Sequence, residues 1–420
     1  MPYLVIPVSP RSRNVDVFDF LMDNVKLSDM APATKFQHTE TRTVYYDNIS
    51  EDKKKDLHFK AIVEQLEWYA KEYRYLLKGS EEYKRFLESG RRFVHSTGGY
   101  ELLENEELYN TFYIPKASSK PGNMKWRKID APCGQLETAL RELKEYLEYL
   151  MGGCTYNTNA FAYIPGRSVK NAVQKHAYNK SKWFLKMDFS NFFGSITIDF
   201  VMRTLSDIFP FSEIVKIPGG YKALKECLEL GFLDGGLPQG TPLSPLLTNI
   251  VMIGIDHKIS TGLRERPEVS PKTGSKCRYV YTRYADDIYI SNRVKFDYKQ
   301  IMDFVKRVLD YYEAPFSLNE KKTRFSSNAG ENWMLGLMYN QDCKVTVGHK
   351  RKKRLKAALT NYMLDRKNGI RWELGDIQQL QGEISYCSSI EKESTQKIIR
   401  DYSEKFGDIK AALREDLRKA

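Results

Sequence analysis

Apolar side chains recur at spacings of three and four in residues 57–77, the pattern of a helix with one buried face. Helical composition extends over residues 54–94, and a short apolar run at residues 3–8 is a strand candidate. The sequence therefore predicts a mainly helical N-terminal extension over residues 1–110, packed through one face of its helix. The apolar residues on that face are Phe59, Ile62, Val63, Leu66, Tyr69 and Ala70.

The pattern changes near residue 111 to short apolar and aromatic runs broken by glycine and proline: TFYIPK, WRKIDAP and NAFAYIPGRS. These runs favour strands and turns. Three more strand-like segments follow, WFLKMDF, CRYVYTRYADDIYISN and NWMLGLMYN, with helical candidates between them. In one candidate, ITIDFVMRTLSDIF, Thr197 can cap the helix N-terminus. This alternation predicts an α+β fold with a mainly antiparallel sheet, and the charged last 70 or so residues predict a small helical bundle.

Lys and Arg outnumber Asp and Glu by 66 to 54, which gives a net charge of +12. This balance suits a nucleic-acid partner, although many basic proteins bind no polyanion. The six cysteines lie far apart without zinc-ligand spacing, so we expect neither disulfides nor a zinc site, and a reducing cytoplasm fits best. The sequence shows no signal peptide and no apolar run of the roughly 20 residues that span a bilayer.

Acidic residues stand at two notable places. Asp286 and Asp287 lie at the tip of an expected hairpin, which must bend if both acids serve one site, because successive strand residues point to opposite faces. An ordinary solvated turn is the alternative. Asp188 ends an apolar strand, so it either lies at a solvent-facing end or is compensated by a cation. Together the three acids would supply the oxygen ligands that magnesium prefers.

Taken in order, the segments FYIPK with KWRKIDAP, AFAYIPGRS, KMDFSNFF, GGLPQGTPLSPLLTNI, RYADDIYIS, SLNEKKTRF and WMLGLMY resemble the successive motifs of bacterial reverse transcriptases related to group II introns and retrons. The resemblance covers roughly residues 111–390, and LPQGTPLSPLLTN with YADD is its most specific part. It implies a right-hand polymerase fold, with fingers at 111–181, a palm with inserted finger elements at 182–340 and a helical thumb at 341–420. It also implies RNA-directed DNA synthesis.

The resemblance makes Asp188, Asp286 and Asp287 ligands of two Mg²⁺ ions, with the backbone carbonyl of Phe189 as a further candidate ligand. Two such ions would activate a primer 3′-hydroxyl and stabilise the leaving pyrophosphate. These three aspartates are the expected catalytic residues.

The resemblance also implies a deoxynucleoside triphosphate site. Lys116 and Arg127 would clamp the triphosphate, and Gln239 would line the pocket. Phe193 would exclude the ribose 2′-hydroxyl, with simple core packing as the alternative. Lys322 would protonate pyrophosphate or contact the triphosphate, and its neighbour Lys321 is the alternative. Residues 333–339 would form the primer grip.

The run HKRKKRLK at residues 349–356 concentrates cations on about two helical turns. A solvated helix face is the usual explanation of such a run, but its place after the primer-grip segment favours contact with a phosphate backbone. The cations expected to bind nucleic acid are Lys350, Arg351, Lys352, Lys353 and Arg354.

Two elements typical of retrons, NAxxH and VTG, each differ here by one residue, as NAVQKH at 171–176 and VTVG at 345–348. With the N-terminal extension, and too few residues after the thumb for a ribonuclease H or integrase domain, the chain looks most like stand-alone defence-associated bacterial enzymes. A structured non-coding RNA template and a DNA product are the expected partners. A template-independent or protein-primed polymerase and a non-catalytic RNA-binding protein remain alternatives, and the oligomeric state is not predicted.

Overall fold

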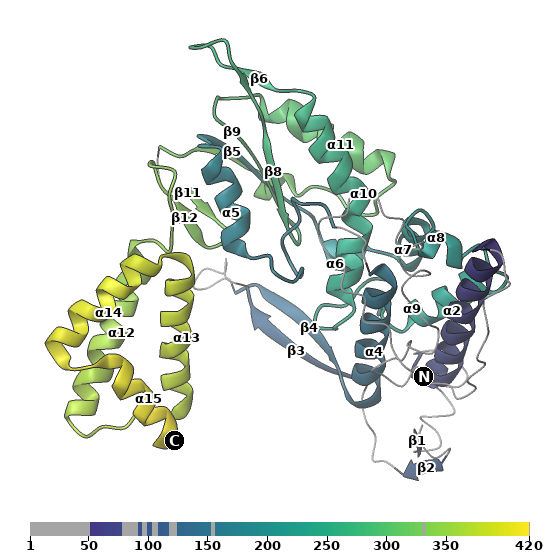
Figure 1. The fold of residues 1–420 in the computed structure, drawn as a ribbon, viewed down its shortest axis with the longest axis horizontal. Helices are drawn as coiled ribbons and strands as arrows, with labels where there is room; N and C mark the ends of the chain where they lie inside the picture. Colours follow the sequence, from purple (N-terminus) through teal and green to yellow (C-terminus); the bar gives the residue numbers. More distant parts are fainter. Residues whose placement is uncertain are drawn as a thin grey trace. The chain divides into compact units, whose positions relative to one another are not determined.

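Helices and antiparallel strands alternate along the chain, which confirms the predicted α+β class (Figure 1). The structure is a computed structural model that describes residues 51–77, 91–94, 99–102, 108–116, 124–152, 156–329 and 332–419. The strand predicted at residues 3–8 lies outside these ranges. Internal contacts divide the chain into two units, each assembled from segments that are distant in the sequence.

The first unit joins the described residues up to Thr158 with Phe189–His257 and Lys306–Leu318. Its strands form two antiparallel pairs, β1 (Arg91–Val94) with β2 (Gly99–Leu102) and β3 (Tyr109–Pro115) with β4 (Trp126–Pro132). Its helices are α2 (Glu51–Tyr73), η2 (Arg74–Leu76), α4 (Gly134–Met151), α6 (Phe192–Ser195), α7 (Ile198–Ser206), α8 (Phe211–Ile214) and α9 (Gly220–Glu229), with the first part of α10 (Ser244–Arg264) and the end of α11 (Tyr298–Tyr311).

Helix α2 confirms the predicted amphipathic pattern, because all six apolar residues of the predicted face are buried. It packs beside α9 (Figure 1). The Tyr69 hydroxyl donates to the carbonyl of Ala139 at 2.7 Å, and the Tyr73 hydroxyl donates to the Glu142 carboxylate at 2.7 Å. Both acceptors lie on α4. The helix of the N-terminal extension is therefore part of the core of the first unit.

The helical expectation is wrong at Arg91–Val94, which forms strand β1. This strand pairs with β2 in antiparallel register, with Phe93 opposite Tyr100. Aromatic and β-branched residues fit a strand as well as a helix, and pairing with a nearby segment overrides the weak helical preference. In contrast, the predicted cap of α7 is confirmed, since the Thr197 hydroxyl accepts the backbone N–H of Phe200 at 3.3 Å.

The second unit joins Asn159–Asp188, Lys258–Val305 and residues 319–420 around a four-stranded antiparallel sheet of order β10-β5-β9-β8. The predicted strand segments appear as β5 (Trp183–Asp188), the hairpin of β8 (Val280–Tyr284) and β9 (Asp287–Asn292), and the hairpin of β11 (Asn332–Met334) and β12 (Leu337–Tyr339). The remaining short elements of the unit are α5 (Val169–Tyr178), β6 (Glu268–Val269), β7 (Lys276–Cys277), η3 (Glu320–Lys322), β10 (Arg324–Ser327) and β13 (Val345–Thr346).

The predicted C-terminal helices are α12 (His349–Lys367), α13 (Leu374–Ile390), α14 (Lys392–Phe406) and α15 (Ile409–Lys419), the yellow-green to yellow group in Figure 1. Their apolar faces join one core cluster with the sheet, which runs from Phe184 and Tyr289 through Tyr339 to Leu355 and Leu380. Among the described residues, no helix is both long and apolar enough to cross a membrane. The division into fingers, palm and thumb stays a prediction, because the two units follow other boundaries.

His176, to which the sequence assigns no chemistry, is fully buried on α5 and joins that helix to the sheet. Its Nδ1 lies 2.6 Å from the Ser291 hydroxyl on β9, and its Nε2 lies 2.8 Å from the Thr282 hydroxyl on β8. Burial, and after it the charge of Lys175, lowers the pKa of His176 to about 3. The folded protein therefore holds this imidazole neutral.

This burial predicts an acid-sensitive fold. Because the pKa of His176 is depressed in the folded state, only the unfolded chain gains a proton as pH falls below the ordinary pKa of 6.5. The free energy of unfolding should fall by about 2 kcal/mol between pH 7 and pH 5 from this group. In urea titrations, His176→Gln should flatten this dependence, whereas His349→Gln, at an exposed position of α12, should keep it. An unchanged slope in His176→Gln would contradict the assignment.

Candidate active site

Asp188 and Asp287 face each other across two paired strands. Asp188 is the last residue of β5, Asp287 is the first of β9, and the two are direct partners in the antiparallel register. Directly opposed residues point to the same face of a sheet, where like charges repel. Asp188 is also 4% exposed. The structure thus brings acids from two separate motifs to one place, where their charge requires compensation.

Asp286 lies in the two-residue turn between β8 and β9. The other turn residue, Ala285, has a φ of 55°, in the left-handed region, and so supplies the bend expected at the hairpin tip. Burial, followed by the negative charges of Asp188 and Asp287, raises the pKa of Asp286 to about 6. The three acids therefore interact electrostatically within the second unit.

Two lysines neutralise the opposed carboxylates. Lys322 Nζ lies 2.5 Å from Asp188 Oδ2, and Lys186 Nζ lies 2.8 Å from Asp287 Oδ1. Burial acts to lower the pKa of Lys186, but Tyr289 and Asp287 outweigh it and raise that pKa. Lys186 was not predicted from the sequence. The sequence does contain a signal for this residue, because Lys186 lies two residues before Asp188 and both side chains therefore point to one face of β5.

The chemistry of this cluster suits a hard divalent cation. Buried and opposed carboxylates concentrate negative charge, and magnesium takes oxygen ligands of this kind. Within the part of the chain that the structure describes, no group of three or more His, Cys, Asp or Glu side chains is arranged to hold a metal ion. The donor types therefore fit magnesium, while the ligand roles of Asp188, Asp286 and Asp287 stay a prediction.

Lys116 and Arg127 belong to the first unit, on the hairpin of β3 and β4. Arg127 pairs with Ile114 in the register, and the backbone N–H of Lys116 donates to the carbonyl of Lys125 at 2.7 Å. Residues two apart along a strand share a face, so the two cationic side chains lie on one face of the hairpin. Both side chains are exposed. This geometry is compatible with the clamp expected for a triphosphate.

Backbone contacts fix Gln239 and Phe193 in the same unit as β4. The carbonyl of Gln239 accepts the backbone N–H of Asp130 at 2.8 Å, and the carbonyl of Phe193 accepts the N–H of Leu237 at 3.1 Å. Gly240 has a φ of 119°, and a Cβ there would lie 3.0 Å from the Asp130 carbonyl oxygen. The glycine of the LPQG turn thus allows the backbone of this turn to approach β4 closely. The same turn is hydrogen-bonded to Phe193 through the backbone of Leu237.

The aromatic residues that follow Asp188 differ in their surroundings. Phe189 and Phe192 are buried and stack with ring centroids 5.1 Å apart, and Phe316 packs against both. Phe193 is only half-buried. Of the neighbours Phe192 and Phe193, only Phe192 is a core residue. The Phe193 ring is therefore partly accessible, as a residue that contacts the sugar must be. The roles of the Phe193 ring and of the Phe189 carbonyl stay predictions.

The predicted primer-grip segment forms the β11-β12 hairpin, whose turn contacts the acid-bearing strand. The backbone N–H of Leu335 donates to the Tyr289 hydroxyl at 3.3 Å, and Tyr289 lies two residues from Asp287 on β9. Trp333 is 41% exposed, and a Cβ at Gly348, just before α12, would collide with its indole ring. The hairpin therefore joins the sheet that carries Asp188 and Asp287 to the start of α12.

Two of the five cations predicted to bind nucleic acid are engaged in ion pairs within the second unit. Arg351 makes a two-point pair with Glu383 on α13, at 2.6 and 2.8 Å. Lys352 Nζ lies 2.8 Å from Glu391 Oε1, between α13 and α14. The other three, Lys350, Lys353 and Arg354, are exposed. The expected contact with phosphates therefore rests mainly on these three side chains.

Comparisons with known proteins identify the class. The profile of the family described as "Reverse transcriptase (RNA-dependent DNA polymerase)" matches residues 114–356, more than half of the chain. The chain belongs to this family, and it is an RNA-directed DNA polymerase by class. This match confirms the resemblance found in the motifs and the right-hand polymerase fold that it implies.

Within the family, the chain is a bacterial enzyme of the retron-like kind. It is 29% identical over 317 residues to the retron Ec73 reverse transcriptase of Escherichia coli, covering 72% of this chain and 94% of the relative. The retron Ec83 reverse transcriptase of Escherichia coli is 25% identical over 314 residues, covering 70% of this chain and 91% of the relative.

Among solved structures, the chain is similar to telomerase from Candida albicans in complex with a fragment of telomeric RNA. The TM-score is 0.40 and the sequence identity 14%, over 75% of this chain and 62% of the telomerase chain. The chain thus spans less than two thirds of that protein. A likeness of this size carries no argument about substrates or partners.

Proposed function

We propose that the chain copies a structured non-coding RNA into DNA, using two Mg²⁺ ions held by Asp188, Asp286, Asp287 and the backbone carbonyl of Phe189. The observation that supports this proposal is that three acids from two separate motifs lie at one end of the β5-β9 pair, in a chain of the reverse transcriptase family. We also propose that it acts in antiphage defence in the bacterial cytoplasm, as its resemblance to defence-associated enzymes implies.

The residues assigned above would together form a polymerase site. Bound magnesium would activate the primer hydroxyl and stabilise the charge of the leaving pyrophosphate. Asp188, Asp286 and Asp287 would provide the negative charge that holds the cations. Lys322, which bonds to Asp188, offers a mobile ammonium to a triphosphate or pyrophosphate oxygen. Lys116 and Arg127 would bind the other phosphate oxygens, the arginine through its planar fork.

Sugar selection gives a direct prediction for Phe193. Its half-buried ring should exclude a ribose 2′-hydroxyl by bulk, so Phe193→Ala should incorporate ribonucleotides and lose at least about tenfold in discrimination, about 1.4 kcal/mol. Phe193→Tyr keeps the bulk and should retain discrimination. Single-turnover incorporation of matched deoxy- and ribonucleotides measures the ratio. Unchanged discrimination in Phe193→Ala would move the gate to another residue.

The proposal of an RNA partner is supported by the net charge of the chain and by its membership of the reverse transcriptase family. A net charge of +12 supplies affinity for phosphates without sequence choice, whereas selection of one RNA requires contacts to folded shape or unpaired bases. Sequencing of RNA that co-purifies from the native host, together with the DNA product, tests this. We expect one dominant RNA and DNA complementary to a defined stretch of it. A random RNA population would contradict the proposal.

We propose that the N-terminal extension selects the RNA partner. The position of α2 determines how much of the extension can be deleted without unfolding the first unit. Deletion into α2 would remove Leu66 and Tyr69 from the core, so the informative truncation removes residues 1–50 only. It should weaken selection of the dominant RNA more than extension of a generic primed template. Equal losses in both would place the selective contacts elsewhere in the chain.

The thumb yields a second binding prediction. Replacing exposed Lys350, Lys353 and Arg354 by glutamine should weaken RNA binding and lower the slope of log affinity against log salt by up to about three. Arg351→Gln should instead lower the melting temperature, because it breaks the pair with Glu383. Salt-dependent binding titrations separate the two. The basic helix face would be merely solvated if the triple variant kept the wild-type slope.

Template-independent synthesis, protein priming and non-catalytic RNA binding remain testable alternatives. Extension without template, or DNA with no complementary RNA, would favour the first, and DNA linked covalently to the chain would favour the second. The third would leave the wild-type protein bound to RNA but inactive in every extension assay.

A further inference from the structure

A cavity of about 690 Å³ opens in the first unit, formed by the segment after α4, by α7, by α10 and by the end of α11. Its size lies in the roughly 300–1,000 Å³ range of ligand sites. None of the residues assigned above to the metal, the nucleotide or the thumb lines it. The cavity is therefore available for a separate role.

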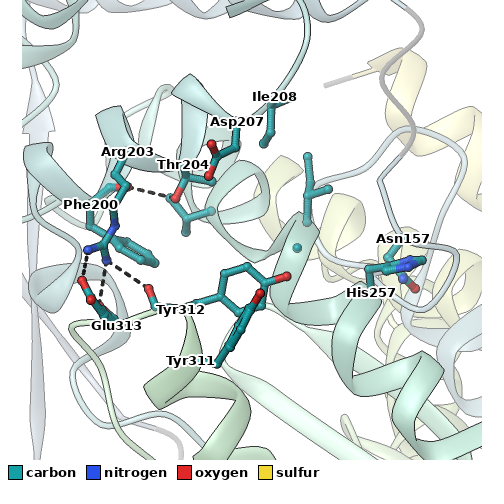
Figure 2. Close-up of a pocket in the computed structure, with 13 residues that line it drawn as sticks. Asn157, Phe200, Arg203, Thr204, Asp207, Ile208, His257, Tyr311, Tyr312 and Glu313 are labelled. Atoms are coloured by element: carbon teal, nitrogen blue, oxygen red, sulfur yellow. Dashed lines mark hydrogen bonds and ion pairs between the residues drawn. The ribbon is translucent and has the colours of Figure 1, made fainter. Parts of the chain in front are cut away.

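One side of the cavity is aromatic. Tyr311 and Tyr312 have ring centroids 5.1 Å apart at an interplanar angle of 83°, and Tyr311 is 68% exposed. The Tyr312 ring lies against α10, where a Cβ at Gly254 would approach it to 3.0 Å. In Figure 2 the two tyrosines lie on one side of the opening, below Thr204 and Asp207. Flat, accessible rings in this position can stack on a planar ligand.

The opposite side offers polar groups at the edge. Asp207 is drawn above the tyrosines in Figure 2, and Asn157 and His257 line another part of the cavity. Burial raises the pKa of the Tyr312 hydroxyl, and the charges of Tyr311 and Asp207 raise it further. The Asp207 residue is itself one of those that line the cavity. A ligand stacked on the tyrosines would present its edge to a hydrogen-bond acceptor.

The charge of the lining disfavours a phosphate. Arg203 pairs with the Glu313 carboxylate, and its Nη2 donates at 3.0 Å to the carbonyls of Tyr312 and Glu313. This arginine is therefore used by the chain itself, and the lining contains no lysine. Asp207 adds a negative charge. The cavity thus suits a planar group without charge better than a phosphate.

We propose that this cavity binds an unpaired nucleobase, stacked on Tyr311 with its edge toward Asp207. A carboxylate only accepts hydrogen bonds, so guanine, which presents two adjacent N–H donors, is favoured over bases that place an acceptor beside a donor. An unpaired base of bound RNA is the source that we favour, because RNA recognition stacks splayed-out bases on aromatic side chains and reads their edges. This contact goes beyond the proposed function, because DNA synthesis does not require it.

The test uses the full chain preloaded with an RNA–DNA primer–template duplex, which occupies the polymerase site. Labelled uridine octamers with one central G, A or C are the probes. The G octamer should bind best, and Tyr311→Ala should weaken it at least about fivefold, as loss of one stacked base predicts. Asp207→Asn should remove the preference for G. Tyr311→Phe, and Tyr178→Ala at a 78% exposed tyrosine outside the cavity, should bind like wild type.

Two outcomes would overturn the proposal or its RNA source, and primer extension is the control. Equal octamer binding by wild type and Tyr311→Ala would overturn it. Direct binding of free guanosine that is lost in Tyr311→Ala, without binding of any octamer, would support a nucleobase site and overturn RNA as its source. Primer extension should stay within about twofold of wild type in the Tyr311 and Asp207 variants, so loss of the polymerase function is seen separately.

Discussion

Replacing Asp286 and Asp287 by alanine is expected to abolish magnesium-dependent DNA synthesis, with a loss of at least about a thousandfold, or about 4 kcal/mol in transition-state stabilisation. The double variant should stay folded. It removes a carboxylate opposed to Asp188 and the acid whose pKa is raised to about 6 by burial and by its acidic neighbours. Lys186 loses its partner, but its side chain is 35% exposed and can reach water.

Asp303→Asn, at an exposed position of α11, is the matched control and should keep full activity. Single-turnover primer extension gives the rate, and thermal unfolding with an RNA-binding titration shows that the protein is intact. Wild-type incorporation by the double variant would contradict the assignment of the three acids as catalytic residues.

Lys322→Gln should lower nucleotide incorporation by about a hundredfold, the scale of a lost general acid or charge-stabilising donor. Its ammonium group lies 2.5 Å from Asp188 Oδ2, yet its side chain is 63% exposed and can swing toward an incoming phosphate. Lys321, the alternative from the sequence, is also exposed. The adjacent pair thus provides its own control.

Lys321→Gln should cost no more than about threefold, because only Lys322 of the two bonds to the acid at the end of β5. The measurement is the single-turnover rate and the apparent affinity for each deoxynucleotide. A larger loss in Lys321→Gln would reverse the assignment, and equal small losses would leave both lysines outside the chemistry.

Local patterns were sufficient to predict much of the fold. The buried face of α2, the cap at Thr197 and the hairpin carrying Asp286 and Asp287 all follow from periodicity and turn chemistry within about 20 residues. These signals succeed because burial and hydrogen bonding act on neighbouring residues there. The same local signals misassigned Arg91–Val94, where pairing with β2 decides the structure.

Contacts between distant segments that carry no recognised motif were not predicted. Strand β10 was not predicted at all, since RFSS has little apolar pattern and is fixed by pairing with β5, with Arg324 opposite Lys186. The ion pair of Arg351 with Glu383 was likewise not predicted. It distinguishes Arg351 from its cationic neighbours, which the sequence alone does not. The NAVQKH element contains His176, but neither helix α5 nor the hydroxyl partners of this histidine on β8 and β9 were predicted.

The candidate site shows the same division. Motif order brought Asp188, Asp286 and Asp287 together in the prediction, and the strand register places Asp188 opposite Asp287. Lys186 was not predicted because the sequence does not show whether a lysine in a strand faces water or pairs with an acid. Its partner Asp287 is known only from the structure. The cavity lined by Tyr311 and Asp207 carries no motif, since its residues come from four separate segments.

Primer extension on an RNA template of mixed sequence, with the product sequenced, tests the central claim most directly. We expect the wild-type chain to extend an annealed primer into DNA complementary to the template, only when magnesium is present, and the Asp286→Ala, Asp287→Ala variant to make none. Product made equally well without template, or wild-type protein that binds the primed RNA but adds no nucleotide, would contradict the account.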